Sequence, residues 1–170
     1  MRTDRIEKII NSMRQHNMDQ MVISDPSTIF YLTGKFVASG ARLFALCLDT
    51  QGACTFFINS LQTDYAPLAE GAEIVWYTDS DDSIQILAKK IRTGGTVGID
   101  KNWPSSFLLR LMAAADAKYV LNSGIIDYIR MVKDDGEIQL MRETQAVNEK
   151  VISEMFQYVS PELTEQKHHR

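Results

Sequence analysis

The sequence predicts an α/β fold: three layers, α/β/α, around a mixed, mostly parallel sheet of about five to six strands. Short apolar runs alternate with amphipathic stretches of helical length, which is the pattern of strands and helices in such a fold. Two of the apolar runs, 44–48 and 54–58, are separated only by a polar turn, so they form a hairpin and make the sheet mixed. The length of 170 residues suits one domain of ordinary size.

The elements of the first half follow from apolar spacing and capping residues. Apolar side chains at helical spacing follow Asp4, which we expect to cap a helix that ends at Asn17. The pair Asp25-Pro26 predicts a second helix start, and Gly34 its end. In chain order we expect a helix at 4–17, a strand at 21–23, a helix at 26–33, a loop at 35–41, hairpin strands at 44–48 and 54–58, and a helix from Ser60 to about residue 70.

The second half repeats the alternation and ends differently. The acidic stretch 79–82 opens a helix that Gly94-Gly95 ends, and Pro104 stands in the first turn of another. Strands are expected at 73–77, 96–99 and 119–121. From Asp134 to about Val159 the spacing predicts one helix, about twice the usual 11–12 residues. The chain thus divides into a domain at 1–132 and a long helix with a polar tail at 133–170, which we expect to begin a further domain.

Composition excludes several classes of protein. The chain is 45% hydrophobic and 24% charged, with a net charge of −4, so it is not disordered, collagen-like or a disulfide scaffold. The acidic balance argues against nucleic acid as a partner. Its apolar runs are too short for a membrane span, and its N-terminus lacks the apolar centre of a signal peptide. We expect a cytoplasmic protein with neither nucleic-acid nor membrane partners.

The two cysteines flank the hairpin turn. If the turn closes at 49–52, Cys47 faces Cys54 across the ladder. The favoured interpretation is a pair of small buried apolar side chains. A disulfide or redox pair is the alternative, which a reducing cytosol disfavours.

The motifs that could support catalysis are weak. Residues 94–98 are glycine-rich but follow a helix and precede a strand, the reverse of a phosphate-binding loop, so we interpret them as a turn. The acidic stretch 79–82 follows a strand and invites a metal or phosphate-transfer hypothesis, although helix capping is the favoured interpretation. The histidines, His16, His168 and His169, stand at a helix end and in the tail, so no metal constellation forms within the fold.

Several segments, in order, resemble one family. Residues 25–34, DPSTIFYLTG, look like the N-I-x-Y-L-T-G signature of the creatinase/prolidase N-terminal domain, with Thr28 in place of the usual asparagine. Residues 125–142, IIDYIRMVKDDGEIQLMR, are similar to the joint that leads into that family's catalytic domain. Residues 5–24 resemble its opening helix and strand, and residues 97–100, VGID, fit between these segments.

The resemblance implies a role within a larger enzyme. It implies the non-catalytic N-terminal domain of an Xaa-Pro peptidase, either a prolidase or an aminopeptidase P, at 1–132, with 133–170 starting the C-terminal catalytic, pita-bread domain. That catalytic domain would bind two divalent metal ions (Mn, Co or Zn) and cleave the bond before proline in a peptide. The ligands lie outside this chain, so we expect no catalytic or metal-binding residue here and no hydrolysis by this chain alone.

The resemblance also implies a homodimer whose N-terminal domains cap the substrate entrance. The loop from Gly34 to Arg42 is the candidate, with Phe36 as an apolar wall and Arg42 pairing with a substrate carboxylate. The alternative is that Phe36 packs under the loop and Arg42 is solvated. Three other functions remain open: a creatinase-type hydrolase domain, a stand-alone metal-free module that binds a peptide or protein, and an independent metal enzyme built on residues 79–82.

Overall fold

The computed structural model describes residues 1–37 and 40–158. It divides into two compact units, Met1–Ile129 and Arg130–Arg170, and each is considered by itself. The predicted end of the long helix at Val159, the polar tail, and His168 and His169 lie outside the described residues.

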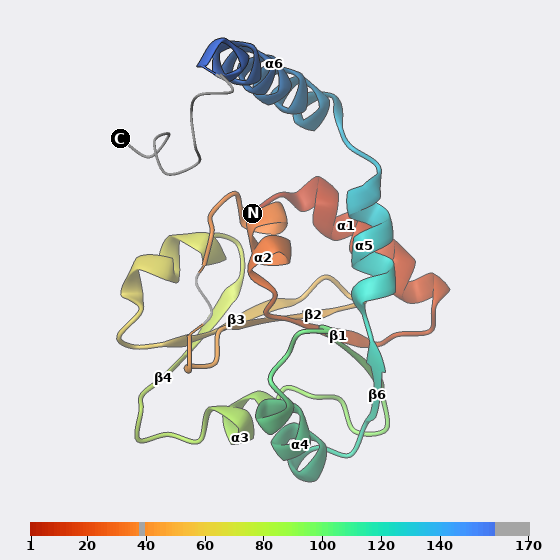
Figure 1. Ribbon diagram of the computed structural model, residues 1–170. Coiled ribbons are helices and arrows are strands. Elements are labelled where there is room, and N and C mark those ends of the chain that lie inside the picture. The colour runs from red at the N-terminus through yellow and green to blue at the C-terminus, as the bar shows by residue number, and fades with distance from the viewer. Residues whose placement is uncertain (38–39, 159–170) are drawn as a thin grey trace. The chain divides into compact units, whose positions relative to one another are not determined.

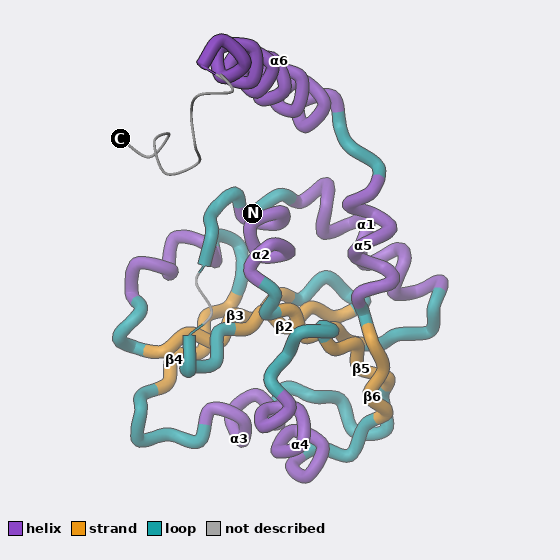
Figure 2. The backbone as a smooth tube through the Cα atoms, in the orientation of Figure 1, coloured by secondary structure: helices purple, strands orange, loops and turns teal. Residues whose placement is uncertain are grey.

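A mixed sheet of six strands forms the middle layer of the first unit (Figure 2). Its order is β4-β3-β2-β1-β5-β6, and only the pairs β1–β2 and β2–β3 are antiparallel. Five strands therefore run in one direction, and β2 alone runs against them. The strands are β1 (Gln20–Ile23), β2 (Ala45–Asp49), β3 (Cys54–Asn59), β4 (Glu73–Tyr77), β5 (Thr96–Ile99) and β6 (Lys118–Leu121).

Helices cover both faces of this sheet, which confirms the predicted three-layer α/β/α fold (Figure 1). On one face, α1 (Thr3–Gln15), α2 (Pro26–Thr33), the 3-10 helix η1 (Thr63–Ala69) and α5 (Ser123–Met131) enclose an apolar core. On the other face, α3 (Ser83–Ala88) and α4 (Ser105–Ala114) enclose a second core. Residues in the middle strands alternate between the two cores, as the pleat requires.

Several local signals act as the sequence predicts. Asp25 caps α2 by accepting from the Thr28 N–H at 2.8 Å, and Gly34 ends that helix at a φ of 75°. Gly98 in β5 has a packing role, because a Cβ there would lie 2.5 Å from Met18 Sδ and 2.9 Å from Asn122 Cβ. Only a glycine lets these two side chains pack against the strand.

Three local predictions are wrong, and one helix was not predicted. Asp4 does not cap α1; it lies in the first turn and pairs with Arg2, while Asn17, at a φ of 52°, does follow the helix end. Ser60 caps no helix: it hydrogen-bonds to Tyr77 O through its backbone, and only the short η1 follows. The acidic stretch opens a helix that already ends at Ala88, and the separate helix α5 was not expected.

The prediction that Cys47 faces Cys54 is also wrong, by one residue of register, whereas the favoured interpretation of two apolar side chains without a disulfide agrees with the structure. Cys54 pairs with Leu48, and Cys47 pairs with Thr55. A shift of one position reverses the side of the sheet, so Cys47 lies in one core and Cys54 packs against the other. Both thiols are free, and burial raises the pKa of Cys47 to about 12.

The second unit is described as one helix, α6 (Asp135–Tyr158). Its start is a reciprocal cap, because Asp134 Oδ1 accepts from the Glu137 N–H at 2.8 Å and Glu137 Oε2 accepts from the Asp134 N–H at 3.0 Å. None of its described side chains is buried. No helix in the described part of the chain has both the length and the apolar character that crossing a bilayer needs.

Candidate functional site

Several polar side chains that are buried, or whose pKa is shifted, lie at the carboxyl edge of the sheet. The five co-directional strands end at this edge, and β2 begins there because it runs the other way. In open α/β sheets this edge is the usual place for ligands, above all where successive connections leave in opposite directions. Here that point lies at β1, which has β2 on one side and β5 on the other.

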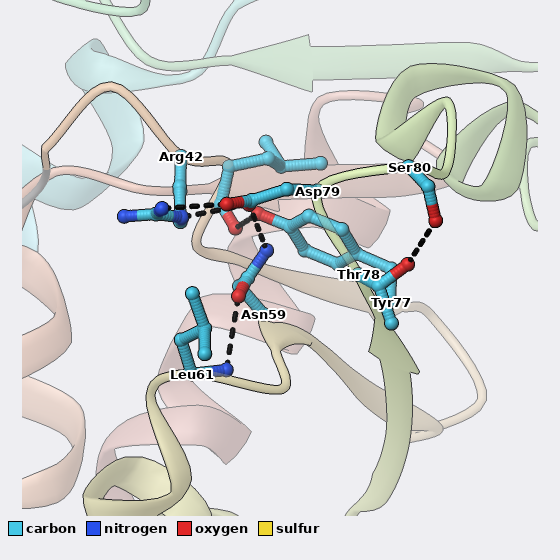
Figure 3. A network of polar contacts seen from close by, with 8 residues as sticks. Arg42, Asn59, Leu61, Tyr77, Thr78, Asp79 and Ser80 are labelled. Atoms are coloured by element: carbon cyan, nitrogen blue, oxygen red, sulfur yellow. Dashed lines mark hydrogen bonds and ion pairs between the residues drawn. The ribbon is translucent and has the colours of Figure 1, made fainter.

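Arg42, just before β2, is held by Asp79, just after β4 (Figure 3). The guanidinium donates to both carboxylate oxygens, from Nε at 2.8 Å and from Nη2 at 2.6 Å. Asn59, fully buried at the end of β3, donates to Asp79 Oδ1 at 2.9 Å. The hydrogen bonds from Arg42, and then those from Asn59, hold the pKa of the Asp79 carboxyl below its usual range.

The backbone beside Arg42 is fixed as well. Tyr77 donates its hydroxyl to the Leu43 carbonyl at 2.6 Å, and Leu61 N–H donates to Asn59 Oδ1 at 3.0 Å. Arg42 is thus held by residues at the ends of two strands, β3 and β4, and Figure 3 shows its remaining nitrogen on the side away from Asp79. A guanidinium fixed on one edge in this way presents its other donors in a set direction.

Asp100 organises the other half of the edge. It follows β5, is 7% exposed, and accepts from the N–H groups of Ser24 at 2.5 Å and Asp25 at 2.8 Å. Burial raises the pKa of the Asp100 carboxyl, and these hydrogen bonds offset part of the rise. Asn122, fully buried after β6, donates to Val22 O at 3.3 Å, while its Oδ1 has no partner among the described residues.

A pocket of about 230 Å³ opens between these two halves. Its walls come from the turns after β1 and β5, the start of β2 and the start of α4. The side chains that matter below are Asp25, Arg42, Asp100, Trp103 and Phe107.

The two residues predicted from the resemblance, Arg42 and Phe36, differ in whether they line the pocket. Arg42 lines the pocket and is about half exposed, so it is neither buried nor simply solvated. Phe36 is 66% exposed and does not line the pocket, so it does not pack under its loop. The entrance role of either residue stays a prediction.

The acidic stretch 79–82 is occupied by structural roles. Asp79 binds Arg42, Asp81 accepts from Thr78, and Asp82 caps α3 and pairs with Arg110 at 2.7 Å. Among the described residues, no three histidine, cysteine, aspartate or glutamate side chains group so as to hold a metal ion. The interpretation of Asp82 as a cap is confirmed, and the described residues do not fit a metal.

Sequence reasoning missed Asp100, Trp103 and Asn59 as part of the site. One signal was available: each follows or ends a predicted strand, and parallel strands bring such positions to one edge.

Comparison with known proteins gives consistent results. A family model described as the Creatinase/Prolidase N-terminal domain matches residues 5–132. An uncharacterized peptidase of Staphylococcus aureus (strain MRSA252) is 24% identical over 170 residues, which is 96% of this chain and 46% of that protein. The chain thus spans about half the length of the curated relatives it matches.

Solved structures share the fold. The dipeptidase PepE from Mycobacterium ulcerans superposes with a TM-score of 0.89 at 23% identity, over 97% of this chain and 46% of that one. The Creatinase/Prolidase N-terminal domain of an X-Pro dipeptidase from Streptococcus pyogenes gives a TM-score of 0.66 at 20% identity, over 76% of this chain and 98% of that one.

Proposed function

This chain belongs to the creatinase/prolidase N-terminal domain family, and on that premise we propose that it serves as the non-catalytic N-terminal domain of a metal-dependent Xaa-Pro peptidase. In this role it supports a homodimer and caps the substrate entrance, and the whole protein hydrolyses the peptide bond before proline. The observation that carries the proposal is the match of residues 5–132 to the family, together with relatives named as peptidases that are about twice as long.

The proposed division of labour follows the chain. Residues 1–132 form the family domain, and residues 133–170 lead into a C-terminal catalytic domain of the same polypeptide. Two divalent metal ions would be bound there, where they activate water and stabilise the transition state. We assign no step of that chemistry to the described residues, because their side chains do not fit a metal.

Arg42 is the residue of this chain that we propose to meet the substrate. Asp79 fixes one edge of its guanidinium, so the other edge is preorganised to donate to a peptide carboxylate. Phe36, which is exposed, would supply an apolar wall for the proline side. In this account Asp79 and Asn59 are positioning residues, since they act through Arg42.

The first test is the intact mass of the natural gene product. The proposal expects a mass well above 19.3 kDa and hydrolysis of a dipeptide with C-terminal proline that a chelator abolishes. A product near 19.3 kDa without hydrolysis would overturn the peptidase proposal and favour the stand-alone binding module. Hydrolysis of creatine in place of the dipeptide would favour the creatinase-type alternative.

The entrance role has its own matched pair of variants. Phe36→Ala in the active protein should raise KM for the dipeptide several-fold with little change in kcat, because it removes an apolar contact made before the chemical step. Phe30→Ala is the control, since Phe30 is also more than half exposed but lies on α2. Equal kinetics for the two variants would remove Phe36 from the entrance.

A further inference from the structure

The pocket at the carboxyl edge is small and has a defined place in the fold. Its volume of about 230 Å³ lies below the roughly 300–1,000 Å³ of sites for drug-sized molecules. It lies at the ends of β1 and β5, where β1 has β2 on one side and β5 on the other. It lies wholly within the unit Met1–Ile129, so its occupant can be tested whether or not the peptidase proposal holds.

One side of the pocket is apolar. Trp103 and Phe107 line it, and their rings lie 6.0 Å apart in a tilted contact. Aromatic walls of this kind stabilise an apolar side chain by removing it from water.

A second side offers hydrogen-bond donors. These donors come from Arg42; the start of α4 also lies at this wall, but the Phe107 N–H there already donates to Pro104 O at 2.9 Å. Arg42 presents a guanidinium whose Nη1 takes no part in the pairing with Asp79.

Trp103 contributes its ring to the pocket wall. It is 7% exposed, it lines the pocket, and its indole N–H has no acceptor among the described residues. Because this N–H exposes almost no surface, an occupant of the pocket meets the Trp103 ring and not its N–H.

A third side carries negative charge. Asp25 and Asp100 both line the pocket, and their carboxylates lie on adjacent turns at the ends of β1 and β5. A simple anion would meet these two carboxylates. A simple cation would meet the guanidinium of Arg42. A molecule that carries both charges on one small frame matches both sides.

We propose that this pocket binds a free α-amino acid with an apolar side chain. The carboxylate lies toward Arg42, the ammonium toward Asp25 and Asp100, and the side chain against the rings of Trp103 and Phe107. Free amino acids are what a dipeptidase releases, so occupancy would couple this domain to the product level if the proposed function holds.

The test uses amide NMR of the isotopically labelled 170-residue chain titrated with L-leucine. The chain has two tryptophans, so their indole signals form an internal comparison. We expect saturable shifts at the Trp103 indole and at the amides of Ser24 and Asp25, and none at the Trp76 indole on β4. Trp103→Phe assigns the signal and keeps the apolar wall.

Two analogues of leucine separate the charges. Isocaproate lacks only the ammonium, and isoamylamine lacks only the carboxylate. We expect L-leucine to bind at least about tenfold more tightly than either, because each loses one set of charge-assisted hydrogen bonds. An analogue that binds as tightly as leucine would overturn the proposal, as would the absence of a saturable shift with leucine.

A matched pair of variants tests the ammonium side. Asp25→Asn keeps a side chain that caps a helix but removes the charge, so leucine should bind about tenfold more weakly while the amide spectrum stays dispersed. Asp82→Asn makes the same change at the cap of α3, outside the pocket, and should leave binding unchanged. Arg42→Gln, at a half-exposed position, gives the corresponding result for the carboxylate side if Asp25→Asn fails to fold. Equal binding by the tested variant and Asp82→Asn would contradict the proposal.

Discussion

The two edges of the sheet use polar side chains in different ways. At the amino edge, where the five co-directional strands begin, these side chains hydrogen-bond to neighbouring turns and strands. Gln20, which is buried, donates to Lys90 O at 2.8 Å and accepts from the Arg92 N–H at 2.6 Å. Asp19 accepts from the Thr96 N–H at 2.8 Å, and Glu73 pairs with Lys90 at 2.7 Å.

The carboxyl edge instead contains groups whose hydrogen bonding is incomplete. The three buried side-chain atoms without a partner among the described residues are Gln62 Oε1, Trp103 Nε1 and Asn122 Oδ1. They follow the ends of β3, β5 and β6, so all three lie at this edge. The pocket and the raised pKa of Asp100 are found there too.

Polar side chains at the amino edge thus stabilise the sheet, and the carboxyl edge is where we propose that a ligand binds. Buried polar groups that lack partners cost stability, and folded proteins retain few of them without a reason. These three atoms are enclosed by protein, so the proposed ligand rests on the pocket and its charged lining instead. Four predictions test this comparison.

The largest expected effect is on stability at the amino edge. Gln20→Ala leaves the Arg92 N–H and the Lys90 carbonyl without their partner, so the free energy of unfolding should fall by about 2–3 kcal/mol. Gln62→Ala at the carboxyl edge removes an oxygen that has no partner and should change it by less than about 0.5 kcal/mol. Urea unfolding measures both variants, and equal losses of unfolding free energy would contradict the difference between the two edges.

Asp100 should make stability depend on pH. Its folded-state pKa lies above the unfolded value near 3.8, so the ionised form destabilises the folded chain. The unfolding free energy of the wild type relative to Asp100→Asn should therefore fall as pH rises through the folded-state pKa. Urea titrations between about pH 3 and pH 8 measure this difference, and a rise would contradict the assignment.

Asp79 should show a smaller dependence of opposite sign. Arg42 lowers its pKa, so its stabilising contribution is present above 3.8 and is lost as pH falls through the lower folded-state value. Wild type relative to Asp79→Asn, followed in the same titrations, should therefore gain stability with rising pH. A flat difference would mean that the pairing with Arg42 does not persist in solution.

The smallest effect concerns the hairpin of β2 and β3. Because Cys47 and Cys54 lie on opposite sides of the sheet, mild oxidation should form no bond between them and leave stability unchanged. A thiol reagent should modify Cys54 before the buried Cys47. Mass spectrometry of a peptide digest detects both a disulfide and the modified thiol. A disulfide between Cys47 and Cys54 would contradict the β2–β3 register.

The sequence predicts the elements well where a local signal fixes them. Asp25, Pro26 and Gly34 set the bounds of α2, and apolar runs locate every strand. It fails where the outcome depends on pairing. The cysteines differ from the prediction by one position of register, which no local pattern fixes.

The site is harder to predict for the same reason. Arg42 and Asp79 are 37 residues apart, and the turn of Asp25 is held by Asp100, 75 residues away. Only the sheet order brings these pairs together. The resemblance could point to the loop of Arg42, but the partner that fixes its guanidinium and the pocket beside it require the structure.

The most direct test of a functional carboxyl edge compares two arginines in the active natural protein. Arg42 and Arg92 are both exposed and both pair with an aspartate, but at opposite edges of the sheet. We predict that Arg42→Gln lowers kcat/KM for a proline dipeptide by about tenfold or more, while Arg92→Gln leaves it unchanged. Equal values for the two variants would contradict the account.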